Sequence, residues 1–119
     1  MSNHPSHLKI LTDNDIDHVE FTDRNILEES IIQAIGDELS AIIESRPTPK
    51  LLINFSNVEH LSSAALGTLI TVNNKIRQKG GQLRFCCIDT NIYEIFVMTK
   101  LNMLFKIYDD IEQATNSFQ

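Results

Sequence analysis

The sequence predicts a single α/β domain, with a mixed sheet of four to five strands and about four helices packed against it. The length of 119 residues is that of one domain, and a hydrophobic fraction of 42% is enough for a small core. Short apolar runs also alternate with helical patterns, in the order β-β-α-β-α-β-α-β-α. Residues 1–7 lack apolar periodicity and predict a flexible tail, so the domain is expected over residues 8–119.

The first half of the chain predicts a hairpin followed by a helix. Residues 8–11 and 16–21 alternate in polarity on either side of a turn-rich segment, which is typical of a β-hairpin. Asn25 and Glu28 have the spacing of a capping box and predict the start of a helix. This helix is expected to run to Ser45, before two prolines, with an apolar stripe of Leu27, Ile31, Ile35, Leu39, Ile42 and Ile43.

The second half predicts three strands that alternate with three helices. A strand begins at Leu51, and the helix after it ends at the Gly80-Gly81 pair, because glycine favours helix termination. No internal repeat or long linker interrupts the order. The remaining elements are a strand at 83–88, a helix at 91–99 with Ile92, Ile95 and Phe96 inward, a strand at 104–108, and a helix through Phe118 opened by a capping box of Asp109 and Glu112.

Charge and hydropathy exclude several classes of function. The net charge of −6, with 16 acidic and 10 scattered basic residues, argues against nonspecific binding to nucleic acid. No apolar run reaches about 18 residues, so no transmembrane helix is expected, and a membrane is not among the expected partners. The N-terminus also lacks the basic-then-apolar pattern of a signal peptide. We therefore expect a soluble, cytoplasmic protein.

The cysteines and histidines show no metal or disulfide pattern. Cys86 and Cys87 are adjacent in a predicted strand, so their side chains should point to opposite faces and stay reduced. No histidine pair has the spacing of metal ligands on a helix. The Gly-x-Ser-x-Gly motif of hydrolases is also missing. We therefore expect no metal, no cofactor and no hydrolytic activity in this domain.

The segment at 51–67 is the most informative part of the sequence. Residues 51–55 (LLINF) have the composition of a buried strand, and residues 56–60 (SNVEH) form a polar turn. Ser62 and Ser63 then begin a helical pattern. One serine should cap the helix, which stabilises it by about 1 kcal/mol. The positive end of the helix would favour an added phosphate. This pattern predicts a switch rather than a catalytic site.

The same segment resembles the signature of the STAS family, the domain shared by sulphate transporters and bacterial anti-sigma factor antagonists. In that signature an apolar strand ending in Asp precedes Asp-Ser-Ser-Gly-Leu-Gly, and residues 62–67 (SSAALG) occupy those six positions. The resemblance places Ser63 on the serine that a partner kinase phosphorylates, with Ser62 as the second candidate. Asn54 replaces the strand-end Asp, Ser62 the second Asp, and Ala65 the first Gly.

The resemblance implies an anti-sigma factor antagonist, which is not an enzyme. The unphosphorylated form would bind a cognate anti-sigma factor with serine kinase activity and free a sigma factor. Phosphorylation would break that complex, and a serine phosphatase is a further expected partner. The membrane-transporter branch of the family is excluded, because no membrane helix is expected. The expected partner-binding residues are Asn57, Glu59, His60, Ser62, Ser63 and Ala64.

Two other interpretations remain open. Neutral Asn54 and Ser62 favour a STAS scaffold or interaction module in another bacterial signalling complex, without regulated phosphorylation. The third interpretation is an enzyme or a carrier of a small ligand. Gly67, one turn into the helix, is expected to permit close packing of the helix on the sheet. The sequence does not indicate the oligomeric state.

Overall fold

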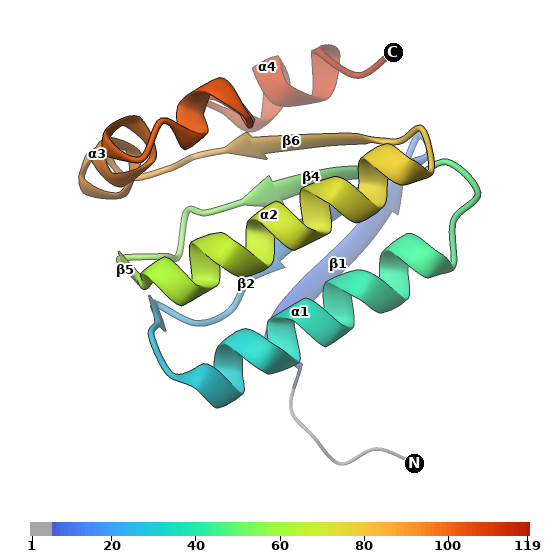
Figure 1. Cartoon of the computed structure of the whole chain (residues 1–119). Helices are drawn as coiled ribbons and strands as arrows, with labels where there is room; N and C mark the ends of the chain where they lie inside the picture. Colours follow the sequence, from blue (N-terminus) through green and yellow to red (C-terminus); the bar gives the residue numbers. More distant parts are fainter. Residues whose placement is uncertain (1–5) are drawn as a thin grey trace.

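Five strands form one mixed sheet within residues 6–119, which are the residues that this computed structural model describes (Figure 1). The order of strands is β1-β2-β4-β6-β7. β1 (Leu8–Asp13) and β2 (Ile16–Phe21) form an antiparallel hairpin, and β4 (Lys50–Asn54), β6 (Gln82–Cys86) and β7 (Lys106–Tyr108) add in parallel. β3 (Asn25–Ile26) and β5 (His60–Leu61) form a separate parallel pair. The predicted α/β domain with a mixed sheet is confirmed.

The helices cover both faces of the sheet. They are α1 (Glu29–Glu44), α2 (Ser63–Gln78), α3 (Thr90–Met98), the 3-10 helix η1 (Leu101–Met103) and α4 (Ile111–Asn116). α1 and α2 lie side by side on one face, and α4 lies on the other (Figure 1). The main core lies between the sheet and α1 and α2, and a smaller cluster of Ile16, Leu52, Cys86 and Ala114 lies beneath α4. No helix within residues 6–119 combines the length and apolar content needed to span a membrane.

Both predicted capping boxes are wrong in detail. α1 begins at Glu29, its N-cap is Glu28, and no side chain caps it. Asn25 instead belongs to β3, where it lies opposite His60. The helix therefore begins later than expected, and its buried stripe is Ile32, Ile35, Leu39 and Ile43, while Leu27 is 52% exposed. In α4, the cap is Asp110 rather than Asp109, and its carboxylate accepts the N–H of Gln113 at 2.8 Å.

The glycines have roles that differ from one another. Gly80 has a φ of +69° after α2, which confirms the predicted helix stop. Gly67 was expected to pack against the sheet, but it is exposed, and a Cβ built there meets no atom within 4 Å. That prediction is wrong because the helix turns Gly67 toward solvent. Close approach occurs at Gly36 of α1, where a Cβ would lie 3.2 Å from Thr68 Cγ2 of α2.

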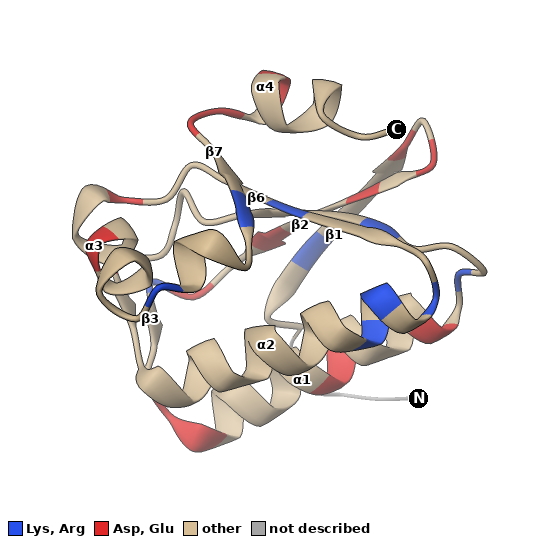
Figure 2. Ribbon diagram, turned by 45° about the horizontal axis from the view of Figure 1, so that its top comes forward, with Lys and Arg blue, Asp and Glu red and all other residues tan. Residues whose placement is uncertain are grey.

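Charged side chains fix the far end of the two parallel helices. Lys79, just after α2, donates hydrogen bonds to the carbonyl oxygens of Ile43, Glu44 and Arg46 at 2.9, 3.2 and 2.7 Å. Figure 2 shows basic residues gathered at this end of α2, beside the last turn of α1. The last carbonyls of a helix lack partners within the helix and carry partial negative charge. Lys79 therefore stabilises the end of α1 and holds it against α2.

The two cysteines do not lie on opposite faces as predicted. The strand ends at Cys86, and Cys87 has a φ of +63°, so the alternation of side chains stops between them. Their sulfur atoms are 3.3 Å apart, and both thiols are free. Burial, together with the hydrogen bond between the two thiols, raises the pKa of the Cys86 thiol far above its ordinary value.

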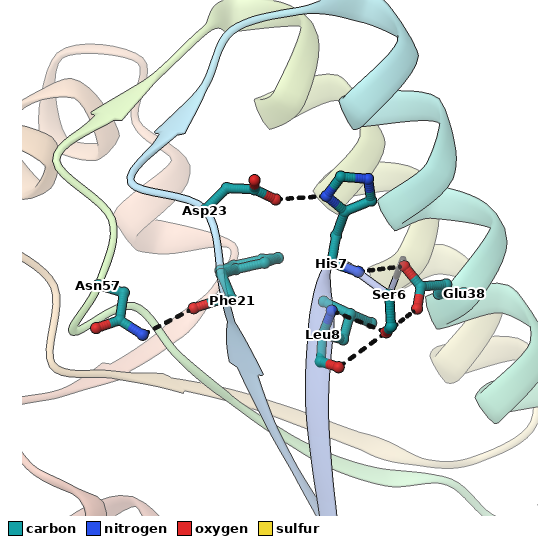
Figure 3. Close-up of polar contacts among 7 residues, drawn as sticks. All are labelled: Ser6, His7, Leu8, Phe21, Asp23, Glu38 and Asn57. Atoms are coloured by element: carbon teal, nitrogen blue, oxygen red, sulfur yellow. Dashed lines mark hydrogen bonds and ion pairs between the residues drawn. The ribbon is translucent and has the colours of Figure 1, made fainter. Parts of the chain in front are cut away.

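The chain before β1 is held against α1 (Figure 3). Of the predicted tail at 1–7, residues 1–5 lie outside the described residues. The Ser6 hydroxyl is hydrogen bonded to the Glu38 carboxylate, and the His7 backbone N–H donates to Glu38 Oε2 at 3.1 Å. His7 Nδ1 lies 2.6 Å from Asp23 Oδ2. These contacts fix the entry of the chain into β1.

Candidate functional site

The loop between β4 and α2 lies at the carboxyl ends of the parallel strands (Figure 1). Its first turn is closed by Asn54, whose Oδ1 accepts the N–H of Ser56 at 2.8 Å, and by the Val58 N–H, which donates to the Phe55 carbonyl at 2.9 Å. Phe55 and Val58 are buried, so the loop is attached to the core at two points. An asparagine suits this position because its side chain readily bonds backbone two residues on.

Phe55 also connects the loop to α3. Its ring contacts Phe21, Phe85 and Phe96, with centroids 5.2, 5.0 and 6.3 Å apart. Phe96 belongs to α3, and its own ring is fully buried. Aromatic pairs at these distances contribute beyond their buried area. The start of the loop is therefore fixed to the same aromatic cluster that positions α3.

The end of β2 and the segment that follows it hold the second part of the loop. Asn57 donates from Nδ2 to the Phe21 carbonyl at 3.0 Å (Figure 3). The same Nδ2 also donates to Glu20 Oε1 at 3.0 Å. The Arg24 carbonyl accepts the N–H groups of Glu59 and His60 at 2.7 and 3.1 Å. These bonds lead into the β3–β5 pair. They leave little freedom in the chain that enters α2.

The β3–β5 pair delivers the chain to the two serines. Ile26 lies opposite Leu61, and the Ser62 N–H donates to the Ile26 carbonyl at 3.1 Å. Sequence reasoning missed both strands, because two residues are too short to show periodicity. The available signal was one apolar residue in each strand directly after a polar one, Ile26 after Asn25 and Leu61 after His60, and both apolar residues are buried.

Ser62 and Ser63 occupy different positions at the start of α2. Ser62 is the N-cap: its Oγ accepts the N–H of Ala65 at 3.2 Å, and its carbonyl accepts the N–H of Leu66 at 3.3 Å. Ser63 is the first helical residue and is exposed. Within residues 6–119 its hydroxyl has no hydrogen-bond partner, and neither do the N–H groups of Ser63 and Ala64. A free hydroxyl therefore stands beside free backbone donors at the positive end of a helix.

The expected partner-binding residues lie along this one stretch of surface. Asn57, Glu59, His60, Ser63 and Ala64 are exposed, and Ser62 is half-buried. Glu59 lies 3.7 Å from Arg24 in an exposed ion pair. The Asn57 amide is engaged in holding the loop. The structure thus brings the six residues together. Two of them also stabilise the fold, because Asn57 holds the loop and Ser62 caps α2.

Exposed apolar side chains of α3 and η1 lie at the same end of the sheet. Tyr93 and Val97 on α3 are 40% and 44% exposed, and Met98 and Met103 are each 83% exposed. Figures 1 and 2 both place α3 at the end of the sheet where α2 begins. The predicted inward residues Ile92 and Phe96 are buried, and Ile95 is partly buried. The outward side chains were not singled out from the sequence, because scattered apolar residues on a surface are common.

The arrangement suits Ser63 as an acceptor of a chemical group, not as a nucleophile activated by its own domain. Within the described residues, no histidine or carboxylate is hydrogen bonded to its hydroxyl. A hydrolytic serine needs such a base held by a third group. The phosphate that a kinase adds, by contrast, needs only an accessible hydroxyl and a favourable electrostatic environment.

Comparisons with known proteins agree with this architecture. The family model described as "STAS domain" matches residues 15–114. The anti-sigma F factor antagonist of Paenibacillus polymyxa is 23% identical over 82 residues, which cover 69% of this chain and 70% of that protein. An anti-sigma factor antagonist (STAS) domain protein from Planctomyces limnophilus has a TM-score of 0.81 at 17% identity, covering 90% of this chain and 93% of its own.

The Bacillus cell fate determinant SpoIIAA in its phosphorylated form is a further structural neighbour. Its TM-score is 0.68 at 12% identity, with 92% of this chain and 96% of that chain covered. At such identities the structural likeness concerns the fold. The family model, however, spans most of the sequence, including the two serines and the elements that position them. The chain is a member of the STAS domain family.

Proposed function

We propose that the protein is an anti-sigma factor antagonist, a protein-binding switch controlled by phosphorylation of Ser63. The observation that carries this proposal is the exposed Ser63 hydroxyl at the first position of α2, which has no hydrogen-bond partner within residues 6–119 and directly follows a loop held by hydrogen bonds and aromatic packing. The names of the sequence relatives support the same class of function. The partner is an anti-sigma factor with serine kinase activity, and a serine phosphatase would restore the unmodified form. The domain itself is not an enzyme and acts in the cytoplasm.

Two of the three departures from the family signature, Asn54 and Ser62, can fill structural roles that an aspartate would also fill. Asn54 closes its turn with a side-chain oxygen, which an aspartate also offers. Ser62 caps α2 with its hydroxyl, and serine and aspartate are both strong N-caps. Loss of the two carboxylates removes negative charge beside Ser63. The kinase supplies the base that takes the hydroxyl proton as the γ-phosphoryl group of ATP moves to Oγ and ADP leaves.

Phosphorylation would act on binding and not on folding. A phosphate adds about −1.5 to −2 charges, and at the start of α2 the free N–H groups of Ser63 and Ala64 favour it. The stability of the domain should change by no more than about 1–2 kcal/mol. A partner that covers Ser63 would have to desolvate this charge, and a penalty of about 2.7 kcal/mol weakens binding a hundredfold. The exposed side chains of α3 would belong to the same contact.

The experiment is incubation of the full chain with ATP and a candidate cognate anti-sigma factor kinase, followed by intact mass and peptide mapping. We expect one added phosphate on Ser63, and none in Ser63→Ala. Ser30 is a matched control, because it is an exposed serine in the first turn of α1 and should not be modified. Phosphate found only on Ser62, or kept in Ser63→Ala, would contradict the assignment.

Affinity for the partner tests the switch separately. Ser63→Asp should bind about a hundredfold more weakly, and Ser63→Ala should bind even in the presence of ATP. Asn74→Asp is the charge control, because it adds the same charge at an exposed position of α2 roughly 16 Å farther along the helix. If a folded Ser63→Asp variant binds as tightly as wild type, the protein is a scaffold module without regulated phosphorylation.

A further inference from the structure

Strand β1 forms an open edge of the sheet. Within the described residues it pairs only with β2, in a one-to-one register without a bulge. Ile10 and Leu11 are 47% and 70% exposed, and no proline interrupts the strand. Folded proteins usually protect such an edge with proline, a bulge or several charges, because an open edge is a template for another strand. This edge therefore has the properties of a pairing surface.

The backbone groups of β1 alternate in direction. The Thr22 N–H donates to the His7 carbonyl at 3.0 Å, so His7 and every second residue after it direct their groups toward β2. Leu8, Ile10 and Thr12 consequently direct their N–H and C=O groups toward the open edge. Any strand that adds to this edge must bond to these three residues.

One of the three residues is already covered within the chain. The Leu8 N–H donates to Ser6 Oγ at 3.1 Å, and the same oxygen lies 2.9 Å from the Leu8 carbonyl (Figure 3). In the described part of the chain, the N–H and C=O groups of Ile10 and Thr12 have no partner. The open edge is thus reduced to two donors and two acceptors, centred on Leu11.

The side chains around Leu11 are complementary to the same side chains on a second, antiparallel copy of β1. Lys9, Leu11 and Asp13 alternate along one face of β1, and all three are exposed. An antiparallel copy related by a two-fold axis at Leu11 would place Leu11 against Leu11 and Lys9 against Asp13 in both directions. The backbone directions allow this register, because Leu11 then forms a pair without hydrogen bonds, with Cα atoms about 4.5 Å apart. Ile10 and Thr12 of the two copies would exchange four hydrogen bonds and satisfy every free group.

We propose that β1 pairs with β1 of a second copy of this chain, antiparallel and centred on Leu11, to give one continuous sheet through a homodimer. The contact is a single strand pair, smaller than the interfaces of about 1,200–2,000 Å² that hold stable complexes. The dimer is therefore weak and depends on concentration. The proposed contact does not involve Ser63, which lies at the start of α2, so this proposal is independent of the proposed function.

Disulfide trapping tests the register. In full-length Leu11→Cys, the paired cysteines would have Cα atoms within the range of a disulfide, and mild oxidation should link two chains at position 11. Lys9→Cys and Asp13→Cys are matched controls on the same face. Their two copies would lie roughly 13 Å apart in this register and should not link to themselves. Peptide mapping separates these links from any through Cys86 or Cys87.

A charge exchange tests the contact without a covalent link. Lys9→Asp places two carboxylates opposite each other and Asp13→Lys two ammonium groups, so each should raise the dimer dissociation constant by about tenfold or more. The double variant restores opposite charges and should return the constant to near the wild-type value. Analytical ultracentrifugation measures the constants, and circular dichroism shows that the variants are folded.

Two results would overturn the proposal. The first is a wild-type chain that stays monomeric up to about 1 mM, a concentration at which an association free energy of about −4 kcal/mol is detected. The second is a dimer in which Leu11→Cys does not link or in which the double charge variant fails to recover. Either result leaves the edge free for an extended segment of another protein.

Discussion

Asp17 on β2 and Arg46 after α1 are joined by two hydrogen bonds, from Arg46 Nε to Oδ2 at 3.0 Å and from Nη2 to Oδ1 at 2.9 Å. Asp17 is buried, and Thr12 donates a third bond to it at 2.6 Å. Burial opposes ionisation of the carboxyl group, but the bonds from Arg46 and Thr12 outweigh it and hold the pKa of Asp17 below its ordinary value. This pair ties the end of α1 to the first hairpin.

The pair predicts how stability depends on pH. Because the folded pKa of Asp17 is lowered, its contribution is fully present above the ordinary aspartate pKa and is lost as the pH falls through the folded value. In Arg46→Ala the buried carboxylate loses its partner, so acid unfolding should begin at a higher pH. Urea unfolding between pH 2 and 7 measures this. Arg24→Ala, which removes only an exposed ion pair, should leave the curve nearly unchanged.

The two serines at the start of α2 should differ in their effect on stability. Ser62→Ala removes the cap bond to Ala65 and should lower the free energy of unfolding by about 1 kcal/mol. Ser63→Ala removes a hydroxyl that has no partner among the described residues, and it should change the free energy of unfolding by less than about 0.5 kcal/mol. Chemical denaturation of both variants provides the comparison. Equal losses would mean that Ser62 does not act as the cap.

Substitution by alanine should have opposite effects on stability at Gly81 and Gly67. At Gly81 a Cβ would lie 2.2 Å from the Pro49 carbonyl oxygen, so Gly81→Ala should destabilise the domain by about 1–3 kcal/mol. Gly67 is helical and open to solvent, so Gly67→Ala should stabilise it by up to about 1 kcal/mol. Melting temperatures of the two variants distinguish the positions. A destabilised Gly67→Ala would restore the idea that this residue packs against the sheet.

The adjacent thiols should differ in reactivity. The raised pKa of Cys86, caused by burial and by the hydrogen bond between the two thiols, keeps it as a thiol well above neutral pH. Cys87 is only half-buried. Native protein treated with iodoacetamide at pH 8 should therefore be modified at Cys87 first, and Cys86 should react only after unfolding. Mass spectrometry of peptides from native and unfolded samples gives the two rates.

The sequence predicted the parts of the fold that depend on local pattern. The alternation at 16–21 identified β2, with Val19 and Phe21 directed to the main core. The apolar run at 51–55 identified β4, and the serine pair identified the start of α2. These elements are long, or they carry a strong boundary residue, so their own side chains define them.

What the sequence did not predict depends on partners distant along the chain. Asn25 has the spacing of a helix cap, but pairing with the strand at His60 outweighs that local preference. The direction in which Gly67 faces depends on the rotation of α2 on the sheet. For the site, residue types indicated Ser62 and Ser63, whereas the bonds from Asn57 and the Arg24 carbonyl that position them were visible only in three dimensions.

The hairpin turn between β1 and β2 has a consequence for the order of folding. Asn14 and Asp15, with φ of 52° and 66°, close the hairpin over two residues, whereas every other pairing in the sheet must wait for a helical crossover. A hairpin forms in about 1–10 μs, and closing longer loops costs more entropy. The β1 edge is therefore among the first surfaces to form in a refolding chain, before α1 and α2 complete the core. Refolding at high protein concentration would expose both edges of the hairpin to other incomplete chains, which would compete with β4 for the β2 edge and meet the β1 edge without an internal competitor.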